Sequence, residues 1–168
     1  DIPTLYLSSH IVRTKADYYR LLQGVTARGE WEPWILYVQH AVEVTASWTN
    51  ARIRAIRDLM TATGEHVRSH APAIYSRELI EVVFAQPYVR IAHLIDHGIA
   101  ERHAASKYLK QLCAIGVLHE EKRGRDKLFI HRKYMDLLGR DDHAFAPYPA
   151  PAGVAAGDGR RPRRKAHE

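Results

Sequence analysis

Apolar residues recur at spacings of three and four through much of the chain, which is the period of amphipathic helices. The pattern predicts one helix over residues 17–26 and a much longer one from Glu30 to Met60. About 30 helical residues would span about 45 Å. A stripe that long, with three Trp residues in it, needs partners to bury it. Residues 1–75 supply only one other clear helix, so we expect this region to be part of a larger helical domain.

Residues 76–139 have a different order of elements. Helical periodicity and turn residues predict three short helices, then a β-hairpin, then a closing helix. The expected ranges are 76–86, 89–97 and 101–115 for the helices, 117–122 and 127–130 for the strands, and 133–138 for the last helix. Three helices followed by a hairpin is the order of a winged helix-turn-helix. We therefore predict a mainly α fold with a small β-hairpin.

The last region, residues 140–168, contains four of the eight prolines and ends in a basic run at 160–165. It has no apolar periodicity, so we expect a disordered basic tail rich in Pro, Ala and Gly. Its positive charge can attract nucleic acid or can simply aid solubility. The expected domain boundaries are therefore 1–75, 76–139 and 140–168.

Composition narrows the class of protein. The net charge of +6 lies mostly after residue 75, and residues 76–139 carry 11 basic against 8 acidic groups. This modest surplus favours an anionic partner. A single cysteine excludes an internal disulfide and a multi-cysteine zinc site, and fits a reducing cytoplasm. No stretch of 18 apolar residues is present, so we expect no membrane helix.

One face of the helix at 101–115 is the candidate DNA-binding surface, because the second helix of a helix-turn-helix lies in the major groove. Tyr108, Leu109 and Leu112 are expected to face inward. The opposite side and the hairpin supply the candidate DNA-binding residues, which are Arg102, His103, Ser106, Lys107, Lys110, Lys122, Arg123, Arg125 and Lys127. Glu101, Glu120 and Glu121 oppose phosphate binding. The same surface can instead be a solvated face used only for packing between domains.

Other candidate chemistry is weak. His66 and His70, like His93 and His97, stand four residues apart, but no third ligand follows at a fixed spacing, so we predict no metal site. Cys113 is expected to be a small buried hydrophobe. No nucleophile and base stand together in the sequence, so we name no catalytic residue.

Two sets of sequence blocks carry a family resemblance. Leu-Tyr-Leu-Ser at 5–8, Asp-Tyr-Tyr-Arg-Leu-Leu at 17–22 and Trp-Glu-Pro-Trp-Ile at 31–35 resemble the Fic family, where they follow the catalytic helix pair. Ser106 to Lys110, Gly116 to Leu118 and Gly124 to Ile130 look like the winged-helix domain at the C-terminus of many Fic proteins. Together they cover about residues 1–138. The resemblance implies that residues 1–75 are a helical remnant of a Fic domain.

The resemblance also implies an activity for the family. Fic proteins transfer AMP from ATP, with Mg²⁺, to a hydroxyl of a target protein, through a loop that reads His-x-Phe-x-(Asp/Glu)-Gly-Asn-Gly-Arg-x-x-Arg. Here His143-Ala144-Phe145 is followed by Ala-Pro, and Gly-Asp-Gly-Arg at 157–160 lies too far downstream. No catalytic residue carries over. We expect the loop to precede Asp1, and the chain as given to hold no cofactor and to be inactive.

Our leading expectation is therefore a C-terminal fragment of a Fic-family protein adenylyltransferase. Its winged helix would bind DNA or a partner, and a protein substrate would be reached through the missing Fic core. The alternative is a non-catalytic winged-helix regulator of transcription that binds DNA. A third reading is a decayed gene product with exposed apolar surface on the long helix.

Overall fold

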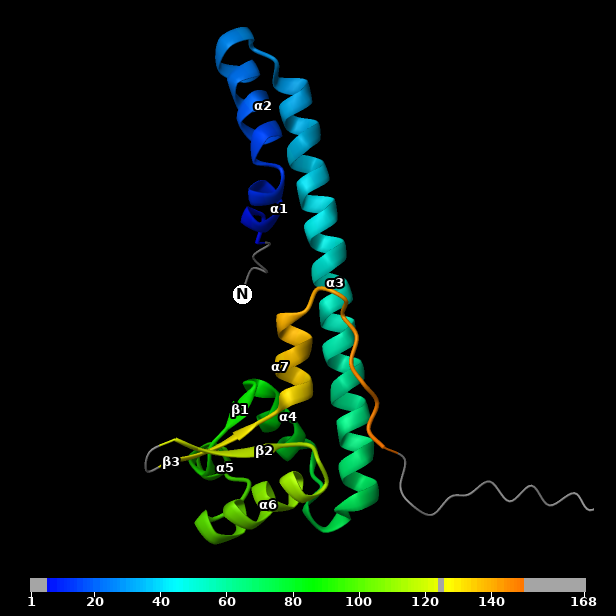
Figure 1. Ribbon diagram of the computed structural model, residues 1–168, viewed down its shortest axis with the longest axis vertical. Helices are drawn as coiled ribbons and strands as arrows, with labels where there is room; N and C mark the ends of the chain where they lie inside the picture. Colours follow the sequence, from blue (N-terminus) through cyan, green and yellow to red (C-terminus); the bar gives the residue numbers. More distant parts are fainter. Residues whose placement is uncertain (1–5, 124–125, 150–168) are drawn as a thin grey trace, which may run out of the picture.

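The computed structural model of the chain describes residues 6–123 and 126–149 (Figure 1). It is mainly helical with a small antiparallel sheet, which confirms the predicted mainly α class. The helices are α1 (Ser8–Arg13), α2 (Lys15–Arg28), α3 (Trp31–His70), the 3-10 turn η1 (Pro72–Ile74), α4 (Arg77–Ala85), α5 (Ile91–Asp96), α6 (Arg102–Ala114) and α7 (Arg132–Gly139). The strands are β1 (Tyr88–Val89), β2 (His119–Arg123) and β3 (Asp126–Ile130).

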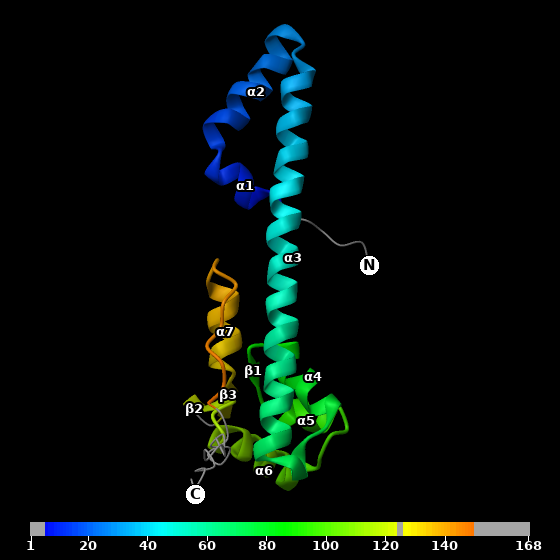
Figure 2. The same cartoon turned by 90° about the vertical axis from the view of Figure 1, so that its right-hand side faces the viewer.

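Helix α3 runs the length of the molecule, with α1 and α2 beside its upper part and the later elements gathered around its lower part (Figures 1 and 2). Its 40 residues span about 60 Å at 1.5 Å each. It is longer than predicted because its buried face continues past Met60 through Thr63 and Val67. Polar residues interrupt the helix often enough that no described helix has both the length and the apolarity to cross a membrane.

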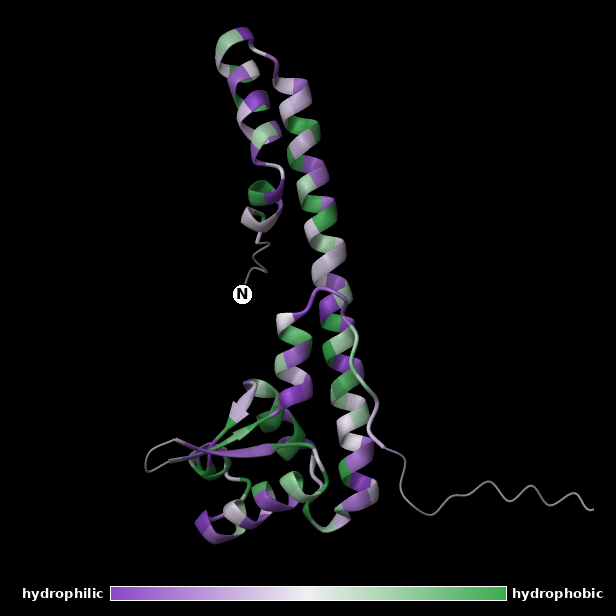
Figure 3. Ribbon diagram, in the orientation of Figure 1, coloured by the Kyte–Doolittle hydropathy of each residue, from purple (hydrophilic) through white to green (hydrophobic). Residues whose placement is uncertain are grey.

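The upper part of α3 pairs with α1 and α2 as a helical hairpin, which confirms the predicted helix at 17–26. Gly29, with a positive φ of 71°, closes α2 and turns the chain back. Tyr18 of α2 packs edge-on against Trp34 of α3, with ring centroids 5.3 Å apart. Thr14 and Tyr37 share a hydrogen bond of 2.8 Å between their hydroxyls. These contacts cover one face of α3, and apolar residues remain on its other sides (Figure 3).

The main core lies at the lower end of α3. Leu59 and Val67 of α3 are fully buried together with residues of every later helix and of the sheet. Their fully buried partners are Leu79, Val83, Val89, Leu94, Ala105, Leu109, Leu112, Phe129 and Leu137. Ser76 caps α4 by accepting a 3.0 Å hydrogen bond from the Leu79 amide, as its sequence predicts. The lower half of α3 is thus a structural part of the C-terminal unit.

The sheet has the order β1-β3-β2, with both neighbouring pairs antiparallel. Strands β2 and β3 form the predicted hairpin, in which Glu120 faces Phe129. Strand β1 was not predicted, because two residues after Pro87 are too few to show a strand period. It lies between α4 and α5, and Tyr88 pairs with Ile130. The order helix, strand, two helices, hairpin is therefore the topology of this unit.

Residues 140–149 form an extended strap that returns from α7 along α3 (Figures 1 and 2). Tyr148 stacks on His66 at 4.4 Å between ring centroids, and its hydroxyl lies 2.9 Å from that of Thr63. Lys133 of α7 donates a 2.6 Å hydrogen bond to the Ala146 carbonyl. We expected disorder from Arg140 onward. The strap is instead packed, and residues 150–168, with the basic run, lie outside the described part of the chain.

Candidate nucleic-acid interface

Helices α5 and α6 meet at a tight turn that fixes their relative direction. Gly98 adopts a φ of +66°, where a residue with a Cβ atom is strained. The chain then enters α6, and the inner face of this helix is set by three residues with no exposed surface: Ala105, Leu109 and Leu112. The opposite face of α6 therefore points to solvent.

The exposed face of α6 carries the predicted basic residues. Arg102, His103, Lys107 and Lys110 are exposed, and Ser106 is half-buried. They border a shallow hollow with Gln111 and Ala114, except for Arg102, which lies at the start of the helix. Within residues 6–123 and 126–149, none of the three basic side chains Arg102, Lys107 and Lys110 forms an ion pair. The face therefore presents free positive charge, as DNA phosphates require.

The hairpin follows α6 directly, and the Val117 amide donates a 2.9 Å hydrogen bond to the Leu112 carbonyl. Lys122 is exposed and faces Lys127 across the two strands. Lys127 is also exposed, but its ammonium lies 2.6 Å from the Glu120 carboxylate. That ion pair reduces the charge that the hairpin can offer to phosphate.

The two remaining hairpin candidates are less fully described. Arg123 ends β2, where it pairs with Asp126 of β3. Arg125 lies outside the described residues. The structure therefore brings five of the nine predicted residues together on α6 and puts two more, Lys122 and Lys127, on the adjoining hairpin.

The histidine pairs have structural partners. His66 is buried with its Nε2 atom 2.8 Å from the Ile115 carbonyl, and His70 Nδ1 lies 2.9 Å from the His66 carbonyl. His97 Nδ1 likewise lies 2.8 Å from the His93 carbonyl. No group of three or more His, Cys, Asp or Glu residues suited to a metal was found in the described part of the chain.

Cys113 is half-buried on α6 and packs against the core. Burial, together with a smaller effect of the nearby Glu120 carboxylate, raises the pKa of its thiol to about 11. A thiol with that pKa carries almost no thiolate at neutral pH, so it is a poor nucleophile. Its role is packing between α6 and the core.

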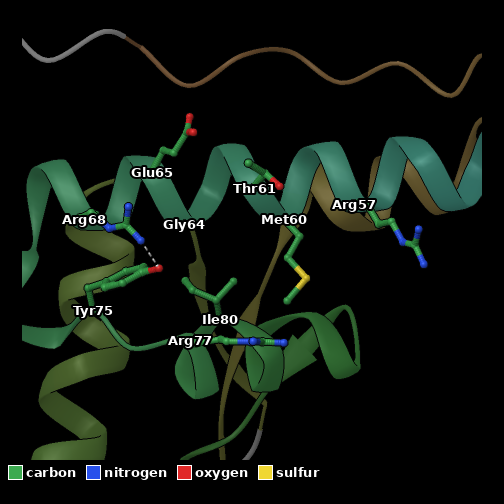
Figure 4. A pocket seen from close by; sticks show the side chains of 9 residues that line it. All are labelled: Arg57, Met60, Thr61, Gly64, Glu65, Arg68, Tyr75, Arg77 and Ile80. Atoms are coloured by element: carbon green, nitrogen blue, oxygen red, sulfur yellow. Dashed lines mark hydrogen bonds between the residues drawn. The ribbon is translucent and has the colours of Figure 1, made fainter.

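A groove between α3 and α4 was not foreseen from the sequence (Figure 4). Three arginines, Arg57, Arg68 and Arg77, stand around it, and we call it the arginine groove. Its other lining residues are Met60, Thr61, Gly64, Glu65, Tyr75 and Ile80. Arg68 donates a 2.6 Å hydrogen bond to the Tyr75 hydroxyl, and its guanidinium lies 4.4 Å from the centroid of that ring.

The signal that could have found the arginine groove is faint. Arg57 and Arg68 lie eleven residues apart on α3, which is close to three helical turns and puts them on one side of the helix. Tyr75 and Arg77 join them only because η1 turns α4 back against α3. Local periodicity does not contain that tertiary contact.

Residues 59–134 match the family described as the C-terminal domain of SoFic-like protein adenylyltransferases. The match begins inside α3 and ends inside α7, so it spans the described core around α4, α5, α6 and the sheet. The match agrees with the resemblance to the C-terminal portion of Fic-family proteins.

Proposed function

We propose that residues 76–139 form a winged helix-turn-helix that binds double-stranded DNA, with α6 as the recognition helix. In this proposal the unit is the DNA-binding end of a Fic-type protein adenylyltransferase. The observation that carries it is the face of α6, where Arg102, Lys107 and Lys110 are exposed and unpaired within the described residues. Cations on an exposed helix bind phosphate by releasing counterions.

The topology supports the same proposal. The sequence of elements from α4 to β3 places α6 on the outside, with the hairpin beside it as the wing. His103 and Ser106 lie among the cations, and both can form short hydrogen bonds to base edges or phosphate. The exposed carboxylate of Glu101 at the start of α6 and the carboxylates of the hairpin repel phosphate. They therefore lower the affinity for DNA.

We further propose that residues 1–75 are the last helices of a Fic-type domain. In this proposal the winged helix at 76–139 follows them, and residues 140–168 form a C-terminal tail. AMP transfer from ATP, with Mg²⁺, to a protein hydroxyl then belongs to the whole protein, in which the catalytic loop precedes these helices. The matched family's description as a protein adenylyltransferase supports this assignment. The cytoplasm is the compartment that we propose, because the chain has one cysteine and no disulfide.

The first experiment measures binding of the chain to a mixed-sequence DNA duplex as a function of salt concentration. Replacing both Arg102 and Lys107 with Ala should weaken binding at low salt by about tenfold or more. The slope of log affinity against log salt should become shallower by about two, one for each lost phosphate contact. Arg13→Ala with Lys15→Ala removes two positive charges from α1 and the start of α2, away from α6, and should change neither quantity by comparable amounts.

Two results would contradict DNA binding by α6. The first is an unchanged affinity in the Arg102 and Lys107 variant, and the second is an equal loss in the control variant. The unit would then serve for packing against another part of the protein or against a protein partner. A non-catalytic DNA-binding regulator remains the alternative, and it differs in one respect. Its native gene product would bind DNA but would carry no active-site loop, as the intact mass and sequence of that product would show.

A further inference from the structure

The arginine groove carries positive charge that no carboxylate of the described chain neutralises. Arg57 and Arg68 are exposed, and neither forms an ion pair within the described residues. Arg77 differs, because its Nε atom lies 2.7 Å from the Glu81 carboxylate. Glu65 is the one acidic residue that lines the groove, and Figure 4 shows its side chain on the side of α3 that faces away from α4. Two of the three arginines can therefore bind carboxylates of another molecule.

Arg68 is held in place before any ligand arrives. Its guanidinium donates a 2.6 Å hydrogen bond to the Tyr75 hydroxyl and lies over the ring of that residue. Tyr75 is itself half-buried and packs against the main core. A guanidinium has five N–H donors, and Tyr75 takes one of them. Because the side chain is already ordered, a ligand at Arg68 loses less free energy to ordering it.

The floor of the groove between the arginines is apolar. Figure 4 shows Met60 and Ile80 between Arg57 and Arg68. Ile80 is buried and Met60 is half-buried. Gly64 adds no side chain, so the groove stays open beside α3. Its volume of about 450 Å³ lies within the range of ligand-binding clefts. The groove can therefore take an apolar side chain between two carboxylates.

The spacing of the two arginines limits what can contact both. Arg57 and Arg68 are eleven residues apart on α3, or about 16.5 Å along the helix axis. Figure 4 shows them at opposite ends of the groove, so one small anion would contact only one of them. An extended peptide advances about 3.3 Å per residue, so about five residues cover the same distance.

We propose that the arginine groove binds an extended acidic peptide segment of a protein partner. One apolar side chain of the segment rests on Met60 and Ile80, and carboxylates on either side of it bind Arg57 and Arg68. The apolar floor favours a peptide over a nucleic acid, because a duplex backbone presents phosphates without an apolar side chain between them.

The arginine groove is separate from the other surfaces of the molecule. It shares no lining residue with the hollow on α6. All of its lining residues except Arg57 lie within residues 59–134, the segment that matches the C-terminal domain family. The groove is therefore a feature of the C-terminal unit, away from the α1–α2 hairpin.

Fluorescence anisotropy of a labelled peptide tests the charges. The probe is fluorescein-Glu-Glu-Ala-Leu-Ala-Glu-Glu, which should bind the full chain at low salt with a dissociation constant below about 100 μM. Arg57→Ala and Arg68→Ala should each weaken binding by about fivefold or more. Arg54→Ala is the matched control, because Arg54 is also an exposed arginine of α3 but does not line the groove. It should change the affinity by less than about twofold.

A substitution on the floor tests the shape. A Cβ atom at Gly64 would lie 3.8 Å from the Tyr75 ring, which is an ordinary contact, and Leu favours a helix over Gly. Gly64→Leu should therefore fold at least as stably as the wild type, as thermal unfolding would show, while its side chain fills the groove and blocks the probe. Replacing the central Leu of the probe with Ser should weaken binding to the wild-type chain by about fivefold.

The proposal is overturned if the probe does not bind the wild-type chain, or if Arg54→Ala weakens binding as much as Arg57→Ala and Arg68→Ala do. It is also overturned if Gly64→Leu binds the probe as well as the wild type. A DNA duplex is the competing occupant. In the chain with Arg102→Ala and Lys107→Ala it should not displace the probe, and displacement there would assign the groove to nucleic acid. Because that chain lacks the α6 charges, this proposal and DNA binding by α6 fail separately.

Discussion

At the scale of single residues, His131 is the most constrained titratable group among the described residues. It has no exposed surface, and its Nδ1 atom accepts a 3.2 Å hydrogen bond from the Tyr134 amide at the start of α7. Its ring packs edge-on against Phe84. Burial, together with a smaller effect of the nearby Lys133 ammonium, lowers the pKa of the imidazole to about 4. His131 therefore acts as a neutral helix cap.

This lowered pKa predicts that stability falls in mild acid. The unfolded chain binds a proton at His131 below about pH 6.5, whereas the folded chain does so only near pH 4, so the free energy of unfolding decreases as the pH drops between these values. The loss should be about 2 kcal/mol between pH 7 and pH 5. Urea unfolding at both pH values measures it. His131→Asn keeps a capping oxygen but cannot titrate, so it should show a smaller acid loss; an equal loss would contradict the assignment.

At the scale of elements, Arg52 of α3 links that helix to the C-terminal end of α7 through hydrogen bonds. The Arg52 guanidinium donates hydrogen bonds of 2.6 Å to the carbonyls of Leu138 and Arg140, at the C-terminal end of α7. It also lies over the Trp48 ring, with its central carbon 4.3 Å from the ring centroid. A cation placed there satisfies carbonyls that have no partner inside the helix.

Arg52→Ala should therefore lower the free energy of unfolding by about 1.5–3 kcal/mol, the range for hydrogen bonds to a charged group. Arg52→Lys should recover only part of this, because a single ammonium cannot hold both carbonyls in the same fork geometry. Denaturant unfolding gives the energies, and hydrogen exchange should speed up in α7 before other helices. If Lys restores full stability, the fork geometry is not what matters.

The individual helices and strands also show how much of the fold could be predicted from the sequence. Helical spacing was enough to find α2, α3 and α6, because each buries one face for several turns. It missed β1, whose two residues hold their place only by pairing with β3, and it missed the strap. Phe145 and Tyr148 lie among prolines, and nothing in the local sequence indicates that Tyr148 will contact His66 and Thr63 on α3. The exposed face of α6 could be predicted from helical periodicity alone. The arginine groove could not, because it forms only when η1 turns α4 back against α3.

At the scale of the whole molecule, α3 fixes the rotational phase between its two ends. Each inserted residue turns everything above it by 100° relative to everything below. One residue inserted after Ser47 should therefore turn the α1–α2 hairpin by about 100° around α3 relative to the core at its lower end. Seven inserted residues, close to two full turns, would leave the two parts within about 20° of their original phase.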